Sequence, residues 1–249
     1  MLLRARLNNV YEWKAVVSAI GDIVEEAMFI CTDDGVTFRG MDSAHVALLD
    51  VTFPKSSFEF YENKTSFFGI NIESFKAILN SCGNEDMLEI TILQDHEMKI
   101  KAEGTLKMEF NLKLIQKTET NTPIPKIDYK TKASIDPTVL THVLSNLRAI
   151  SEYISINSQI EGMQFLSKGD SGDAVITIET NSPDLKKYET LEDTIAVYSL
   201  DYMAKIIRTI GKASKNISLE YSNKNPMHMI FEMPSMVTVN YYLAPRVEN

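Results

Sequence analysis

The sequence has few of the residues from which metal centres, redox sites and disulfides are built. Its four histidines, at positions 45, 96, 142 and 228, have none of the spacings of a metal-ligand set. Of its two cysteines, Cys31 lies in a strand-like run and Cys82 at an apolar helix position, so both are expected to be small core residues. There is no phosphate-binding glycine loop and no nucleophile elbow. The sequence therefore predicts no cofactor, no metal and no catalytic residue.

Long apolar runs and an excess of basic charge are also missing. No stretch approaches the length needed to span a bilayer, and the N-terminus runs into Arg4 and Arg6 without a signal core. We therefore expect an intracellular protein with no membrane partner. With 25 basic against 34 acidic residues, the net charge is -9. A protein that simply coats DNA should be basic, so that class is disfavoured, but a chain that gathers its positive charge on one face is not excluded.

What the sequence does contain is a helical motif that occurs four times. Residues 13–20, 75–82, 140–147 and 203–210 each place apolar side chains at positions 1, 4, 5 and 8, the spacing of one helix face. The copies recur at intervals of roughly 62 to 65 residues, which indicates an internal repeat. A glycine (Gly21, Gly83 or Gly211) follows three of the copies, where a helix is expected to stop.

The second face of each predicted helix carries small, polar or basic residues and no acidic one. Its sixteen positions are Lys14, Ala15, Ser18, Ala19, Lys76, Ala77, Asn80, Ser81, Thr141, His142, Ser145, Asn146, Ala204, Lys205, Arg208 and Thr209. Any one such helix could simply cover a sheet. Because all four share the pattern in an acidic chain, a common surface that faces a polyanion is favoured.

The remainder of the chain predicts strands, in two halves of similar plan. In the first half the strand-like runs are 25–31, 36–41, 45–53, 58–61, 66–72, 88–92, 98–102 and 106–115. In the second half they are 131–135, 153–157, 162–166, 174–179, 194–200, 217–221, 229–233 and 238–243, with a turn at 167–173. Asp136 and Pro137 are typical of a helix start. The sequence thus predicts an α+β fold with two duplicated β-rich domains, each with two helices.

A polar stretch separates the two halves. Residues 116–130 contain Pro123 and Pro125 and show no apolar periodicity, which indicates an extended linker. The predicted organisation is an N-terminal domain at 1–115, a connecting linker at 116–130 and a C-terminal domain at 131–249.

Four short motifs resemble the proliferating cell nuclear antigen (PCNA) family of sliding DNA clamps. They are MDSAHVAL at 41–48, CGNED at 82–86, Ile124-Pro125, and YYLAP at 241–245. The resemblance runs along the whole chain in order and is closer to archaeal than to eukaryotic members. It implies the DNA clamp fold, a ring-forming trimer whose helices line the hole. It also implies a non-enzymatic DNA sliding clamp, a polymerase processivity factor that encloses duplex DNA without reading base edges.

The resemblance assigns residues to a DNA-facing surface and to a pocket for client peptides. The DNA-facing residues are Lys14, Lys76, His142, Lys205, Arg208 and Lys212. Because the first three helices carry so few cations, direct DNA binding is expected to be weak and strongly salt-dependent. The pocket residues are Met41, His45, Val46, Leu48, Ile124, Pro125, Pro226, Tyr242, Leu243, Ala244 and Pro245. Clients of the family carry a glutamine, an aliphatic residue and paired aromatics. Val46, Leu48 or Tyr242 alone could equally be a core or strand residue, so the pocket depends on the whole set.

The partners implied are encircled double-stranded DNA, DNA polymerase, a clamp loader, flap endonuclease and DNA ligase, in an archaeal nucleoid or a eukaryotic nucleus. Edge strands near 107–114 and 173–180 are the candidates for pairing between identical subunits. Two alternatives stay open. The chain could be one subunit of a heterotrimeric clamp, or an α+β enzyme. For an enzyme, the nearest carboxylate pairs are Asp33-Asp34 and Glu85-Asp86, both in turns beside a glycine.

Overall fold

The computed structural model describes residues 1–7, 10–94, 96–116, 122–170 and 172–246. Within these residues the chain forms four α-helices and eighteen β-strands. It divides into two compact units. Unit 1 comprises Met1–Thr122 and Met233–Val239, and unit 2 comprises Pro123–Glu232 and Asn240–Asn249. The predicted α+β class with two helices in each half is confirmed.

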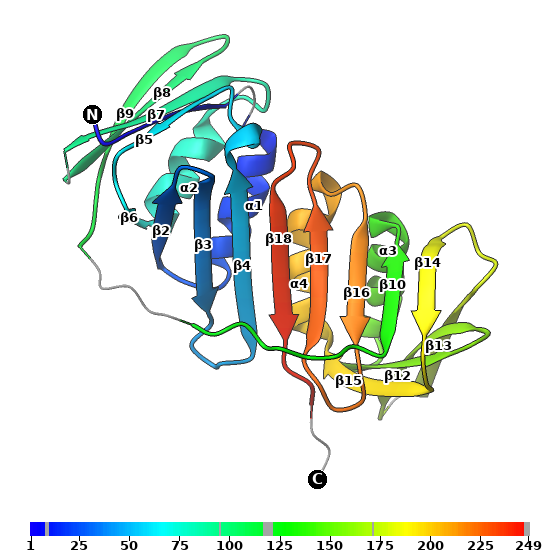
Figure 1. Cartoon of the computed structure of the whole chain (residues 1–249). Helices are drawn as coiled ribbons and strands as arrows, with labels where there is room; N and C mark the ends of the chain where they lie inside the picture. Colours follow the sequence, from blue (N-terminus) through cyan, green and yellow to red (C-terminus); the bar gives the residue numbers. More distant parts are fainter. Residues whose placement is uncertain (8–9, 95, 117–121, 171, 247–249) are drawn as a thin grey trace. The chain divides into compact units, whose positions relative to one another are not determined.

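Unit 1 contains two antiparallel sheets and two helices. Its strands are β1 (Leu3–Leu7), β2 (Glu26–Thr32), β3 (Gly35–Met41), β4 (Ala47–Pro54), β5 (Phe60–Asn63), β6 (Phe67–Asn71), β7 (Met87–Gln94), β8 (Glu97–Glu103) and β9 (Lys107–Lys113). They form a five-stranded sheet in the order β5-β1-β7-β8-β9 and a row β4-β3-β2-β6. The helices α1 (Tyr11–Gly21) and α2 (Ile72–Ser81) contact each other and lie behind β2, β3 and β4 in Figure 1.

Unit 2 repeats this plan. Its strands are β10 (Thr131–Ile135), β11 (Tyr153–Gln159), β12 (Gly162–Gly169), β13 (Gly172–Glu179), β14 (Leu185–Thr190), β15 (Thr194–Ser199), β16 (Ile217–Tyr221), β17 (Met227–Glu232) and the part of β18 (Thr238–Leu243) from Asn240 onward. One row runs β14-β10-β16-β17-β18, and a separate sheet runs β13-β12-β11-β15. The helices α3 (Pro137–Arg148) and α4 (Leu200–Ile210) pack together behind β10, β16 and β17 (Figure 1).

The four helices are amphipathic as the repeat predicts. Of the sixteen apolar motif positions, only Ile78 is not fully buried, and these side chains fill the core beneath the sheets. On the second face only Ala19 is buried, so the polar face of α1 is narrower than predicted. The predicted start of α3 is confirmed, because Asp136 Oδ1 accepts a hydrogen bond from Thr138 N at 2.9 Å.

Three of the helices end at, or within two residues of, the predicted glycine. None of Gly21, Gly83 and Gly211 adopts the left-handed conformation of a glycine cap, so the predicted helix ends are confirmed without that cap geometry. Gly21 is the last residue of α1, and Gly211 opens a short 3₁₀ turn, η2 (Gly211–Ala213). A Cβ at Gly21 would lie 2.9 Å from Ile72 Cγ2. The missing side chain therefore lets the first residue of α2 approach the end of α1.

Two strand predictions needed correction, and two strands, β1 and β14, were not predicted. The run 45–53 forms a strand only from Ala47, because His45 has φ +58° in a turn closed by Asp42. Asp42 Oδ1 accepts hydrogen bonds from the backbone N–H groups of Val46 at 2.8 Å and Ala47 at 2.7 Å. The turn predicted at 167–173 is shorter, since Lys168 still pairs with Asp173. The strand β14 was not predicted, because four of its six residues, KK and ET, are polar or charged.

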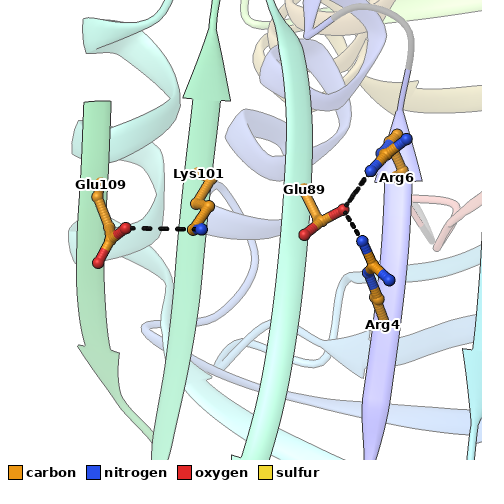
Figure 2. A network of polar contacts seen from close by, with 5 residues as sticks. All are labelled: Arg4, Arg6, Glu89, Lys101 and Glu109. Carbon is orange, nitrogen blue, oxygen red and sulfur yellow. Dashed lines mark hydrogen bonds and ion pairs between the residues drawn. The ribbon is translucent and has the colours of Figure 1, made fainter. Parts of the chain in front are cut away.

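A row of alternating charges crosses the five-stranded sheet of unit 1. The register places Arg6, Glu89, Lys101 and Glu109 opposite one another on four neighbouring strands. Figure 2 shows Glu89 between Arg4 and Arg6, whose Nη2 atoms lie 2.9 and 2.7 Å from Glu89 Oε2. Burial alone would raise the pKa of Glu89, but the hydrogen bonds from the two guanidinium groups outweigh it and leave the pKa below its ordinary value.

Replacing Glu89 by glutamine is expected to lower the free energy of unfolding at pH 7 by about 1 to 2 kcal/mol, because the three hydrogen bonds from Arg4 and Arg6 lose the carboxylate charge. The folded pKa of Glu89 is depressed, so its contribution is present above the unfolded pKa of about 4.3 and is lost as the pH falls through the folded value. The difference between the two proteins should therefore shrink below about pH 4. Urea unfolding of both proteins at several pH values measures this difference in the free energy of unfolding.

The matched control is Glu62→Gln on β5, the edge strand of the same sheet. Glu62 lies 4.0 Å from Lys64, and both side chains are well exposed, so this change should cost under about 0.5 kcal/mol at any pH. An effect of Glu89→Gln no larger than that of Glu62→Gln would show that the charge row does not stabilise the sheet.

Candidate functional site

Among the four helices, α4 with the short turn η2 after it carries the most exposed basic residues. Lys205, Arg208 and Lys212 recur at intervals of three and four residues along α4 and η2, and all three side chains are exposed. This spacing places them on one face of the helix. We call these three residues the α4 basic stripe. His142 is exposed on the neighbouring helix α3.

Three cations of the other helices lie within reach of nearby acceptor groups. Lys14 Nζ donates to the carbonyl of Cys82 at 2.7 Å and to Asn84 Oδ1 at 3.0 Å. Lys76 Nζ lies 3.7 Å from Glu73 Oε1. At the end of α3, Arg148 Nη2 lies 2.7 Å from Asp201 Oδ1. The sequence shows no acid at the sixteen face positions, yet carboxylates outside those positions still reach two of the cations.

The predicted pocket residues of unit 1 surround one turn. Met41 ends β3 and is partly exposed, as is Val46, and His45 is exposed at the tip of the turn. Leu48 on β4 has 3% of its surface exposed. Leu48 is therefore a core side chain, and Met41, His45 and Val46 are the members of this set that reach the surface.

The predicted pocket residues of unit 2 come from three segments. Five of them are partly exposed: Ile124, Pro125, Pro226, Ala244 and Pro245. Tyr242 is 8% exposed and Leu243 is completely buried at the end of β18. Leu243 is thus a core residue, whereas the Tyr242 ring lies at the boundary between the core and the surface.

A histidine that the sequence analysis did not select lies directly against Tyr242. The rings of His228 and Tyr242 are parallel within 3°, with centroids 4.4 Å apart. Tyr129, which precedes β10, lies 6.1 Å from His228, ring centroid to centroid. Its hydroxyl is buried and has no hydrogen-bond partner among the described residues, and burial raises its pKa. No sequence pattern identifies this cluster, because its members are about 14 to 113 residues apart.

Of the edge strands among the described residues, the longest in unit 1 is β9 and the longest in unit 2 is β13. The strand β9 is last in the five-stranded sheet, and β13 is last in the four-stranded sheet. Beside β13 lies a groove of about 610 Å³, lined on one side by Val139, His142 and Val143 of α3 and on the other by Ile176 and Ile178 of β13. An open, partly apolar edge of this kind can pair with another strand.

The two carboxylate pairs that the enzyme hypothesis would use both lie in turns. Asp33 and Asp34 are exposed in the β2–β3 turn, and Asp86 Oδ2 accepts a hydrogen bond from Gly83 N at 2.7 Å. In the part of the chain that the structure describes, no three histidine, cysteine or acidic side chains are grouped to hold a metal ion. No described helix is both long and apolar enough to cross a membrane.

Comparison with known proteins gives matches along the whole chain. Family models described as proliferating cell nuclear antigen, N-terminal domain and C-terminal domain match residues 2–121 and 123–246. DNA polymerase sliding clamps of Cenarchaeum symbiosum and Nitrosopumilus maritimus are 33% and 32% identical, with 100% of each chain covered. The crystal structure of PCNA from Thermococcus kodakaraensis has a TM-score of 0.93 at 18% identity, covering 98% of this chain and 100% of that one.

Proposed function

Because this chain belongs to the proliferating cell nuclear antigen family and is a DNA polymerase sliding clamp, we propose that three copies of it close head to tail into a ring around duplex DNA. The observation that carries this proposal is the pair of open edges, β9 in unit 1 and β13 in unit 2. Two different edges on one chain make a head-to-tail contact, which closes into a ring when the rotation fits. A heterotrimer is not favoured by the relatives found.

The two edges complement each other in one antiparallel register. Both strands alternate inward and outward side chains, with Phe110 and Ile176 inward at their centres. Opposing these two residues overlaps 107–113 with 173–179 over the full length. Lys107 then faces Glu179, and Lys113 faces Asp173. Opposite charges directly across a strand pair each contribute about 0.2 to 1 kcal/mol. The groove beside β13 is the place for apolar side chains of the neighbouring subunit.

Light scattering of the purified chain at micromolar concentrations tests the ring. The expected mass is three times the 28.1 kDa of one chain. Retention on circular duplex DNA, with release after the DNA is cut, would support enclosure of the duplex by the ring. A persistent monomer or dimer would contradict the homotrimer and would point to partner subunits that differ in sequence.

Inside the ring, the α4 basic stripe provides most of the attraction for DNA. Enclosure keeps the duplex bound, so the inner charge needs only to centre it. Arg208→Ala is expected to weaken binding to linear duplex DNA and to lower the slope of log affinity against log salt by about 1 for each Arg208 at a phosphate. Lys14→Ala should have less than half this effect, because Lys14 is held by Cys82 and Asn84.

Fluorescence anisotropy with a labelled linear duplex between 50 and 200 mM salt measures both variants. If Arg208→Ala and Lys14→Ala lost the same amount of DNA affinity, that result would contradict a larger contribution of α4 to DNA binding. Tight binding of the unchanged protein at physiological salt would contradict weak, enclosure-based retention altogether.

The partners of such a clamp dock at those motif-selected residues that reach the surface, at the 41–46 turn of unit 1 and around Tyr242 in unit 2. Polymerase, clamp loader, flap endonuclease and ligase present short peptides whose aromatic side chains enter the pocket and whose backbone pairs with the linker or tail. The clamp itself performs no chemistry. It acts where the DNA is, in the nucleoid if the source resembles the archaeal relatives.

A further inference from the structure

A row of polar side chains crosses the sheet of unit 2 and ends at Tyr242. The strand registers place Lys132 opposite Glu220, and Glu220 opposite His228. Glu220 uses both carboxylate oxygens: Oε1 lies 3.2 Å from Lys132 Nζ, and Oε2 lies 3.1 Å from His228 Nδ1. The exposed fraction of the side chains falls along the row, from 56% for Lys132 to 20% for Glu220 and 12% for His228.

The imidazole of His228 is held on both of its polar edges. Nδ1 faces Glu220, and Nε2 lies 2.9 Å from Asn240 Oδ1 on β18. Turning the ring would break both contacts, so His228 presents one fixed flat surface. That surface is stacked on the ring of Tyr242, two residues beyond Asn240 on the same side of β18.

Partial burial of three polar groups is a costly way to fill space. An apolar residue at position 228 would pack against Tyr242 without desolvating a carboxylate, an amide and an imidazole. What the polar arrangement adds is orientation, because hydrogen bonds have preferred directions and apolar contacts do not. A Tyr242 ring held in one orientation loses less conformational freedom when a ligand binds to it.

We propose that His228 is a positioning residue of the client pocket. Its anchored imidazole sets the orientation of the Tyr242 ring, which forms the wall that receives an aromatic side chain of a client peptide. This inference rests on the proposed function of the pocket. It adds His228 to the eleven pocket residues predicted from the motifs. His228 acts through Tyr242 and does not touch the client.

The test uses the full-length chain and a fluorescent peptide that carries a glutamine, an aliphatic residue and two adjacent phenylalanines. His228→Ala is expected to weaken peptide binding about five- to tenfold, the size of one lost aromatic pair. His228→Phe keeps a ring against Tyr242 but loses the hydrogen bonds to Glu220 and Asn240, so it should still weaken binding, by about two- to fivefold. The mass in light scattering and the melting curve confirm that each variant is folded, and His228→Asn replaces His228→Ala if the latter does not fold.

A double-mutant cycle separates positioning from a general loss of stability. In a Tyr242→Leu background, His228→Ala should cause little further loss, because the ring through which it acts is gone. An equal loss in both backgrounds would overturn the proposal, as would unchanged binding in His228→Phe or no loss in His228→Ala. If the unchanged chain does not bind the peptide, the pocket itself is wrong and the role of His228 with it. If the unchanged chain binds and Tyr242→Leu is weakened, only the role of His228 is in question.

Discussion

Reversing the charges of Lys107 and Lys113 to glutamate is expected to break the ring into smaller species. In the register that overlaps the two open edges, both lysines face carboxylates, Glu179 and Asp173. The double change replaces two attractions by two repulsions at every interface, a loss of about 2 kcal/mol, or roughly 30-fold in the dissociation constant of each interface. Light scattering between 0.1 and 10 micromolar should show the fall in mass, most clearly at the lowest concentration.

The complementary change makes this prediction specific to the register. Reversing Asp173 and Glu179 to lysine in the same chain restores opposite charges across the interface and should restore the trimer. The matched control reverses Lys55 and Lys64 to glutamate, which alters the net charge equally at two exposed positions away from β9. If the control dissociates as readily, the cause is net charge. If the four-fold variant stays dissociated, the register or the choice of edges is wrong.

Replacing Tyr242 by alanine is expected to abolish most stimulation of a DNA polymerase while leaving the ring intact. Tyr242 lies at the boundary of the core, stacked on His228, and an aromatic wall in a client pocket is the kind of residue whose truncation costs 2 kcal/mol or more, at least about 30-fold in affinity. Primer extension at limiting clamp concentration measures the loss, and light scattering on the same sample reports the oligomer.

The neighbouring residue provides the contrast. Leu243 is completely buried, so Leu243→Ala should lower the free energy of unfolding by about 2 to 5 kcal/mol through lost packing. Its effect on polymerase stimulation should follow that loss of stability and disappear at a lower assay temperature, whereas the effect of Tyr242→Ala should remain. Dissociation of the ring in Tyr242→Ala would show that this residue is structural instead.

The sequence by itself determined the class of fold and the family. Helix faces repeat over three to four residues and strand faces over two, so the four helices, the β2–β3 hairpin and the start of α3 at Pro137 could all be predicted from neighbouring residues. The family motifs are equally local, since MDSAHVAL and YYLAP are each continuous in the chain.

Only the tertiary structure decided which side chains of different helices and strands contact each other. From the sequence, Lys14 is expected to be an exposed cation. In the structure its ammonium group donates to Cys82 and Asn84, which lie 68 and 70 residues further along the chain. His228 is an isolated histidine until the registers of β16 and β17 bring it against Glu220. Ion pairs and ring contacts distinguish one helix or one pocket wall from another. Most of them join two residues that are far apart in the sequence. No periodicity encodes such pairs, because they arise only when separate strands and helices pack together.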